Sequence, residues 1–275
     1  MNTKITTTKK VSLAYSPCPN DSYVLGAIAS RDVAIPGIEF DITLLDIDAL
    51  NSAALEQRYD IIKVSCHAYL QIMKNYRLLD TGAAMGYGNG PLLLSSQSRS
   101  LDELQDCSVV FPGKETTACL LFQLIGVETA EHHFIPYNEI IPRVKSGEFD
   151  CGVIIHEGRF TYKESGLHLI CDLGEWWEIE TGLPVPLGCF VIRKSIDNEF
   201  ASKFESLMRR SFCERNIDDA GSDQYIINNS QEIDPAVLKS HIELYVNSFT
   251  KSLGVTGHQA INVLAERASL QGLIS

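Results

Sequence analysis

Polar side chains that could do chemistry gather at four points where an apolar, strand-like segment gives way to a helix-like one. The four segments are residues 16–21 (SPCPND), 63–65 (KVS), 113–117 (GKETT) and 156–157 (HE). They offer a thiol, hydroxyls, a lysine and a histidine. Ligands in α/β proteins collect at the carboxyl ends of strands. We therefore expect the four segments to meet around one site.

His156 is the strongest candidate for a catalytic side chain. It follows the apolar run CGVII at residues 151–155, and its unperturbed pKa suits proton transfer near neutral pH. We predict that it is a general base; the alternative is a hydrogen-bonded structural histidine. His67 follows the 63–65 segment, but it is expected to lie one turn into a helix and to be structural.

Thr116 and Thr117 open a predicted helix after Gly113. Unpaired N–H groups and the positive end of the helix dipole make such a position a site for a carboxylate or a phosphate. We predict that the two threonines bind the carboxylate of a small molecule, with a plain helix N-cap as the alternative. The GKETT stretch lacks the GxxxxGK[ST] spacing, which excludes a nucleotide-binding P-loop.

A metal site is not predicted. The sequence contains neither HExxH nor a CxxC pair, and the adjacent His132 and His133 would point to opposite faces of a strand. Cys18 could be a nucleophile, but no base is assignable to it from the sequence. A buried thiol is the preferred interpretation.

Hydrophobic periodicity places these residues in two α/β units. In the first unit, strands are predicted at 11–15, 38–45 and 61–64, with helices at 48–58 and 65–74. In the second, strands are predicted at 108–111, 133–135 and 151–155, with helices at 116–125 and 138–145. From residue 198 the pattern is helical to the end, with Leu238, Ile242, Tyr245 and Phe249 on one face. The alternation of strand and helix favours mainly parallel sheets.

These units predict two α/β lobes joined by two crossing strands, at 92–94 and 189–192. Residues 1–94 together with 193–275 are expected to form lobe one, and residues 95–192 lobe two, with the substrate cleft between them. The glycines at 86, 88 and 90 and the segment 186–188 flank the crossing strands. They are the predicted hinges.

Composition excludes several classes of function. The formal net charge of −12 opposes binding to a nucleic acid. Neither a signal-peptide pattern nor an apolar run long enough to cross a membrane occurs, so no membrane partner is expected. The eight cysteines are irregularly spaced within apolar segments, which indicates reduced thiols and a cytoplasmic location.

The motifs SPCPND, KVSCHAY, GAAMGYGNGPLLL, GKETT and GVIIHEGRFTYKESGLHLICDLGEWWEIETGLPVPLG occur in this order. Together they resemble the 1,4-dihydroxy-6-naphthoate synthase family of the futalosine route to menaquinone. The likeness runs from about residue 11 to residue 194. One departure is Ser22-Tyr23 after SPCPND, where the family usually has Thr-Phe.

The resemblance implies a periplasmic-binding-protein-like type II fold and a lyase that converts cyclic dehypoxanthine futalosine to 1,4-dihydroxy-6-naphthoate. The base of the family's IHEGRF motif corresponds to His156. Its substrate-binding stretches correspond to Lys63, Val64 and Ser65, and to Thr116 and Thr117. Aromatisation of the ring can drive the reaction, so no cofactor is expected.

Two other functions stay open from the sequence. One is the chorismate dehydratase of the same pathway, against which the HEGRF and SPCPND motifs speak. The other is a non-catalytic intracellular protein that binds a small carboxylate, since fold alone never proves function. The expected partner is in each case a small carboxylate, which is aromatic in the favoured one. The sequence does not decide between a monomer and a homodimer.

Overall fold

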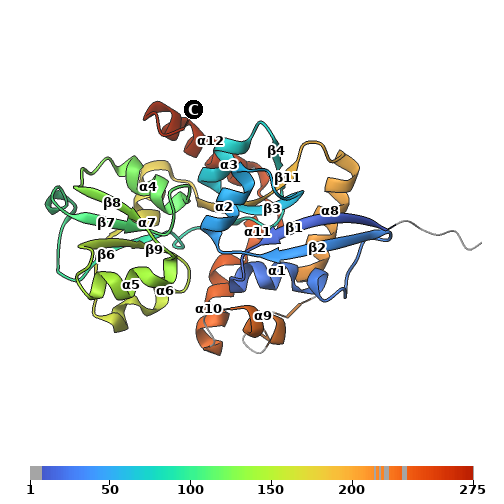
Figure 1. Ribbon diagram of the computed structural model, residues 1–275, viewed down its shortest axis with the longest axis horizontal. Helices are drawn as coiled ribbons and strands as arrows, with labels where there is room; N and C mark the ends of the chain where they lie inside the picture. Colours follow the sequence, from blue (N-terminus) through green and yellow to red (C-terminus); the bar gives the residue numbers. More distant parts are fainter. Residues whose placement is uncertain (1–7, 214, 217, 220–222, 231–233, 275) are drawn as a thin grey trace, which may run out of the picture.

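Two α/β lobes lie side by side in the computed structural model, which describes residues 8–274 apart from 214, 217, 220–222 and 231–233 (Figure 1). The chain starts in the lobe on the right of Figure 1, crosses to the lobe on the left, and returns. Two α/β lobes were predicted from the sequence, and this part of the fold prediction is confirmed.

Lobe one is built from the first and last thirds of the chain. Its N-terminal elements are β1 (Lys9–Tyr15), α1 (Pro19–Ala29), β2 (Ile38–Leu44), α2 (Ile47–Leu55), β3 (Ile61–Ser65), α3 (Cys66–Ile72), β4 (Tyr76–Leu78) and β5 (Ala84–Gly86). Its C-terminal elements are β11 (Val185–Arg193), α8 (Asn198–Cys213), α9 (Gln224–Asn229), α10 (Pro235–Tyr245), α11 (Ser248–Lys251) and α12 (Gly254–Leu270).

Lobe two is formed by the middle of the chain. It contains β6 (Leu92–Ser95), β7 (Ser108–Phe111), α4 (Thr117–Ile125), β8 (Glu131–Phe134), α5 (Tyr137–Lys145), β9 (Cys151–Ile154), α6 (Gly158–Thr161), β10 (His168–Asp172) and α7 (Leu173–Thr181). Two short 3₁₀ turns, at Leu101–Glu103 and Tyr162–Ser165, complete it.

Each sheet is mixed, because the strands next to the crossings run against their neighbours. The order in lobe one is β2-β1-β3-β11-β4, with β5 also paired to β11; the order in lobe two is β10-β6-β9-β7-β8. The β1 strand is parallel to β2 and β3, and β7 is parallel to β8 and β9. In contrast, β11 is antiparallel to β3, β4 and β5, and β6 to β9 and β10. The prediction of mainly parallel sheets is therefore wrong for β6 and β11.

The strand pairing also places the crossings between the lobes at other positions than predicted. The predicted division at 94/95 and 192/193 assigns β6 mostly to lobe one and β11 mostly to lobe two. Backbone pairing assigns them the other way, β6 to the second sheet and β11 to the first. The chain therefore crosses just before β6 and just before β11. The apolar sequences of β6 and β11 predict that these strands are buried, but not which sheet each one joins.

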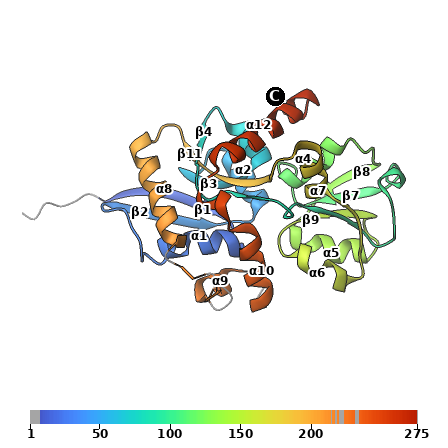
Figure 2. The ribbon, with the colours of Figure 1, turned by 180° about the vertical axis from the view of Figure 1, so that it is seen from behind.

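Apolar side chains continue across the junction of the lobes. One core cluster contains Leu50 and Val64 of lobe one together with Phe111 and Trp177 of lobe two. The C-terminal helix α12 lies over the same junction in both ribbon views (Figures 1 and 2). From it, Arg267 donates to the carbonyl oxygen of Glu180 at 3.0 Å. No helix among the described residues is long and apolar enough to cross a membrane.

The first crossing is held tightly, not loosely. Gly90 lies so close to Gly174 that a Cβ on Gly90 would come within 2.3 Å of the Gly174 Cα. The Gly88 N–H donates to a Glu178 carboxylate oxygen at 2.7 Å, and Gly88 has a φ of +68° that favours glycine. Glycine at 90 thus permits close packing. A hinge role for this segment stays a prediction.

Candidate active site

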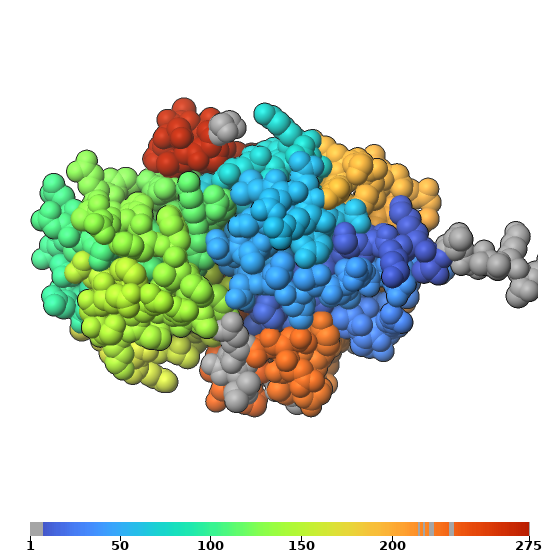
Figure 3. Space-filling model, viewed as in Figure 1, coloured from blue at the N-terminus to red at the C-terminus, as the bar shows by residue number. Residues whose placement is uncertain are grey.

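A cleft with a free volume of about 630 Å³, part of it open to solvent, lies between the lobes. Residues from all four sequence segments line it, among them Ser16, Asp21, Lys63, Ser65, Thr116 and His156. The expected convergence of the four segments is confirmed. In the space-filling view, α2 (blue) meets the green side chains of lobe two on the face shown (Figure 3).

A buried ion pair lies at the lobe-one side of the cleft. Lys63 Nζ donates to Asp21 Oδ1 at 2.8 Å and to the carbonyl oxygen of Gly82 at 2.9 Å, and it lies 4.7 Å from the centre of the Phe190 ring. Ser16 Oγ donates to the other Asp21 oxygen at 2.7 Å. Lys63, predicted to bind substrate, is thus already paired with groups of the protein.

Val64 and Ser65 differ in their access to the cleft. The Val64 side chain is fully buried in the core and its backbone pairs with Cys189 of β11. The Ser65 side chain lines the cleft. Asn51 Nδ2 donates to Ser65 Oγ at 2.9 Å, and the Ser65 N–H donates to Asn51 Oδ1 at 2.8 Å. Ser65 can still donate its hydroxyl hydrogen to a ligand, whereas the Val64 side chain is not within reach.

Thr116 is the N-cap of α4, as the alternative interpretation expected. Its Oγ1 accepts from Cys119 N at 3.2 Å and donates to the Gly113 carbonyl oxygen at 2.7 Å. Thr117 Oγ1 donates to the Leu187 carbonyl oxygen of lobe one at 2.7 Å. Both threonines line the cleft. Because the hydroxyls and the Cys119 N–H already have partners, the N–H groups of Thr117 and Ala118 at the start of α4 are the donors left for an anion.

His67 is structural, as predicted. It is buried, and its ring nitrogen Nδ1 lies 3.3 Å from the Thr116 carbonyl oxygen. The backbone N–H of His67 donates to Thr117 Oγ1 at 3.3 Å. A carbonyl oxygen accepts, so Nδ1 carries the hydrogen. Burial lowers the pKa of His67. The residue ties α3 of lobe one to the start of α4 in lobe two.

His156 stands at the end of β9 with a φ of +58°. A non-glycine residue in this left-handed region costs about 1–3 kcal/mol and is typical of functional sites. The pKa of His156 is lowered to about 4, mainly by burial; Asp21 raises it and Lys63 lowers it. The imidazole is therefore neutral at pH 7 and has a lone pair that can take a proton.

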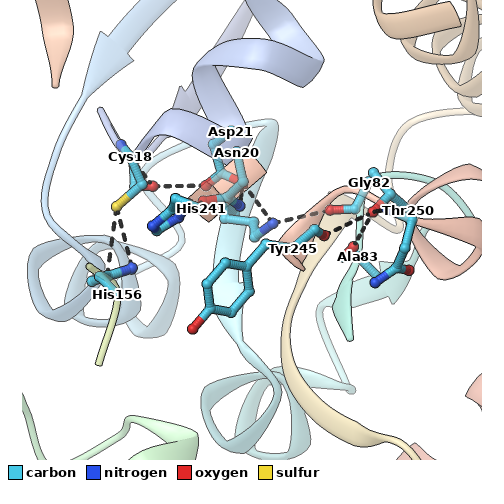
Figure 4. A network of polar contacts seen from close by, with 12 residues as sticks. Cys18, Asn20, Asp21, Gly82, Ala83, His156, His241, Tyr245 and Thr250 are labelled. Atoms are coloured by element: carbon cyan, nitrogen blue, oxygen red, sulfur yellow. Dashed lines mark hydrogen bonds and ion pairs between the residues drawn. The ribbon is translucent and has the colours of Figure 1, made fainter. Parts of the chain in front are cut away.

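Side chains from both lobes hold the His156 ring. Cys18 Sγ lies 3.5 Å from Nδ1 and 3.6 Å from Nε2 (Figure 4). The Tyr137 ring packs edge-on with its centre 4.8 Å from that of the imidazole. Burial, assisted by Asp21, raises the pKa of the Cys18 thiol well above its usual value. Cys18 is thus a buried thiol, as preferred from the sequence, but it has a histidine beside it that the sequence did not reveal.

His132 and His133 do not share a site. The His132 ring packs against Phe111 and Phe122, while the His133 ring packs against Phe149. These partners belong to separate apolar clusters. The prediction that adjacent histidines point to opposite faces is confirmed.

Sequence reasoning missed several residues near the site, among them Tyr137, which packs on the His156 ring. Asn51 holds Ser65, Tyr245 lines the cleft, and His241 lies beside His156. Tyr245 was recognised only as part of an apolar helical face. His241 is four positions before it, so the i, i+4 spacing was the available signal.

Two lobes with a ligand cleft at their junction define the periplasmic-binding-protein-like class, and solved structures agree. The alkanesulfonate-binding protein SsuA of Xanthomonas axonopodis superposes with a TM-score of 0.74 at 13% identity, covering 97% of this chain and 94% of that one. At this identity the likeness shows the fold alone. A crystal structure of a protein from Archaeoglobus fulgidus superposes with a TM-score of 0.86 at 34% identity, covering 96% and 98%.

Sequence comparison defines the family within this class. The model of a family described as menaquinone biosynthesis matches residues 11–270. The 1,4-dihydroxy-6-naphthoate synthase of Streptomyces coelicolor is 40% identical, covering 96% of this chain and 94% of its own. That of Thermus thermophilus is 36% identical, covering 95% and 94%. The chain therefore belongs to the menaquinone-biosynthesis family, and the resemblance found in its motifs is confirmed.

Proposed function

We propose that this protein is a carbon–carbon lyase that converts cyclic dehypoxanthine futalosine to 1,4-dihydroxy-6-naphthoate, with His156 as general base. The names of the two curated relatives support the reaction. The observation that carries the role of His156 is its position: the residue lies after β9 with a strained backbone, and its neutral imidazole lines the cleft between the lobes.

The carboxylate of the substrate is anchored at the start of α4. The N–H groups at the start of α4 and the Ser65 hydroxyl are donors in the wall of the cleft. Lys63 adds a positive charge that is partly balanced by Asp21. An aromatic carboxylate bound there places the sugar-derived carbons toward His156.

His156 then removes a proton from the sugar-derived part, and the proton goes to the imidazole. The electron pair of the C–H bond forms a double bond of the new aromatic ring, while the electron pair of the broken carbon–carbon bond leaves with the fragment, whose carbon is then protonated. The leaving fragment departs as a small sugar-derived molecule, and the imidazolium returns its proton to a product or to water. A positioned base contributes about 10²–10⁴-fold to such a step. Cys18 and Tyr137 orient the ring.

The eight cysteines are free thiols. Disulfides are rare in reducing compartments, so this supports our proposal that the protein works in the cytoplasm.

The test is an assay of the purified protein with cyclic dehypoxanthine futalosine, followed by mass spectrometry of the products. We expect 1,4-dihydroxy-6-naphthoate to form, and to form far more slowly with His156→Asn. Chorismate, tested in parallel, should remain unchanged. Conversion of chorismate alone would identify the sister dehydratase, and binding of the futalosine derivative without turnover would identify a non-catalytic binding protein; either result would refute the proposal.

A further inference from the structure

His241 is a buried histidine next to the proposed base that the reaction above does not use. It belongs to α10 and is 1% exposed. Its ring centre lies 6.1 Å from that of His156 with an angle of 21° between the planes, and 4.6 Å from that of Tyr245. Figure 4 shows His241 between the Asn20–Asp21 pair and His156. It therefore faces lobe two from lobe one.

A chain of hydrogen bonds fixes which nitrogen of His241 carries the hydrogen. Asn20 Nδ2 donates to Asp21 Oδ1 at 2.9 Å, which leaves the side-chain amide oxygen of Asn20, Oδ1, to face His241 Nε2 at 3.0 Å. A carbonyl oxygen only accepts, so Nε2 is the protonated nitrogen. Asp21 is itself held by Lys63. Burial and the nearby His156 keep the pKa of His241 well below its usual value, so Nδ1 stays unprotonated.

His241 Nδ1 is therefore a bare acceptor. It is shielded from solvent and has no hydrogen-bond partner among the described residues. A buried acceptor without a donor is unfavourable and is rare in native proteins. Three neighbours of His241, namely Asn20, His156 and Tyr245, line the cleft. The group that completes Nδ1 can thus reach it from the cleft when the lobes open.

The chemistry of that group follows from the lone pair on Nδ1. An anion would be repelled by it, so the carboxylate is bound elsewhere, at the start of α4. A hydroxyl group can donate to it. The proposed substrate carries hydroxyl groups on its sugar-derived part, the part that must lie near His156.

We infer, on the basis of the reaction proposed above, that His241 is a substrate-binding residue whose Nδ1 accepts a hydrogen bond from a hydroxyl of the sugar-derived part. Closure of the lobes then holds this part between His241 of lobe one and His156 of lobe two. The anchored hydroxyl presents the neighbouring C–H bond to the base.

The test compares His241→Phe with His241→Gln. Phenylalanine keeps a ring but has no acceptor, whereas glutamine can donate to Asn20 and accept from the substrate. We expect His241→Phe to lower kcat/KM by about 5- to 150-fold, the range for leaving one buried polar group unpaired, and His241→Gln to retain more activity. The affinity for 1,4-dihydroxy-6-naphthoate, which lacks the sugar-derived part, should be unchanged in both.

Substrate analogues with each sugar-derived hydroxyl replaced by hydrogen give a readout in the wild-type enzyme, which does not depend on the folding of a variant. One analogue should lose kcat/KM by the same factor, and His241→Phe should not distinguish it from the substrate. Full activity of every analogue, full activity of His241→Phe, or an equal loss of product affinity would overturn the inference. A wild-type protein without turnover would instead refute the proposed reaction.

Discussion

Cys18 Sγ lies 3.5 Å from His156 Nδ1, although the two residues are 138 positions apart and belong to different lobes. The contact joins the turn after β1 to the loop after β9 (Figure 4). The surroundings of the proposed base are thus completed where the lobes meet. Changes that separate the lobes should disturb the base without touching it.

Replacing Cys18 tests this contact. We expect Cys18→Ala to lower kcat by about 2- to 12-fold, because one hydrogen bond that orients the ring is worth about 0.5–1.5 kcal/mol. Cys18→Ser keeps a donor and should lie between the variant and the wild type. Steady-state kinetics measure both, with thermal unfolding as the control for folding. An alanine variant with wild-type kcat would show that the thiol does not position His156.

The low pKa of His156 predicts an unusual pH dependence. An ordinary histidine base would lose activity as the pH falls through about 6.5. With the pKa lowered to about 4, kcat/KM should stay level from about pH 8 to pH 5. An acid limb centred near pH 6.5 in the wild type would contradict the lowered pKa of this imidazole.

The free energy of unfolding should also depend on pH, because the pKa of His156 is lowered in the folded protein. Below pH 6.5 the unfolded chain protonates His156 while the folded chain does not until about pH 4. The unfolded state then binds more protons, so the free energy of unfolding falls as the pH is lowered between these values. His241 acts in the same direction. His156→Asn should therefore show a shallower loss of stability in urea titrations over this range.

Variants of Thr116 test both its role as a helix cap and the proposed anion site at the start of α4. Thr116→Val removes the N-cap of α4 and should lower the free energy of unfolding by about 1 kcal/mol, whereas Thr116→Ser should leave it almost unchanged. Loss of the cap loosens the first turn of α4, so its N–H groups hold an anion less well and the dissociation constant for product should rise in the valine variant. Binding should persist, because the N–H groups themselves remain. Identical product affinity in both variants would place the carboxylate elsewhere.

Closure of the lobes is open to a direct measurement in solution. Cys18 and His156 approach each other from opposite lobes, and we expect the ligand-free protein to populate more open forms. Adding product should then reduce the radius of gyration measured by small-angle scattering. Equal values with and without product would indicate that the cleft is preformed.

Local patterns in the sequence were sufficient for the four cleft-lining segments and for the strands and helices beside them, but not for β4, β5, β10 and α7. The apolar run before His156 predicts where a strand ends. The glycine turn before Thr116 predicts where a helix starts. Parallel strands then bring such ends to one edge. This is why the four segments could be expected to meet.

The partners of these residues could not be read from local patterns. The Asp21–Lys63 ion pair and the Cys18–His156 contact join segments 42 and 138 positions apart, and both depend on how the sheets pack. The role inferred for His241 rests on an unpaired ring nitrogen, which only the three-dimensional structure shows. The sheet membership of β6 and β11 was misassigned for the same reason, since pairing partners are non-local.

The rate of product formation by His156→Asn tests the central claim most directly. Asparagine is polar and of similar size, and it tolerates a positive φ better than most residues, so the fold and the affinity for 1,4-dihydroxy-6-naphthoate should be retained. We predict that kcat falls by about 10²–10⁴-fold, the contribution of a positioned general base. A folded His156→Asn enzyme that binds product normally and turns over at close to the wild-type rate would contradict the account.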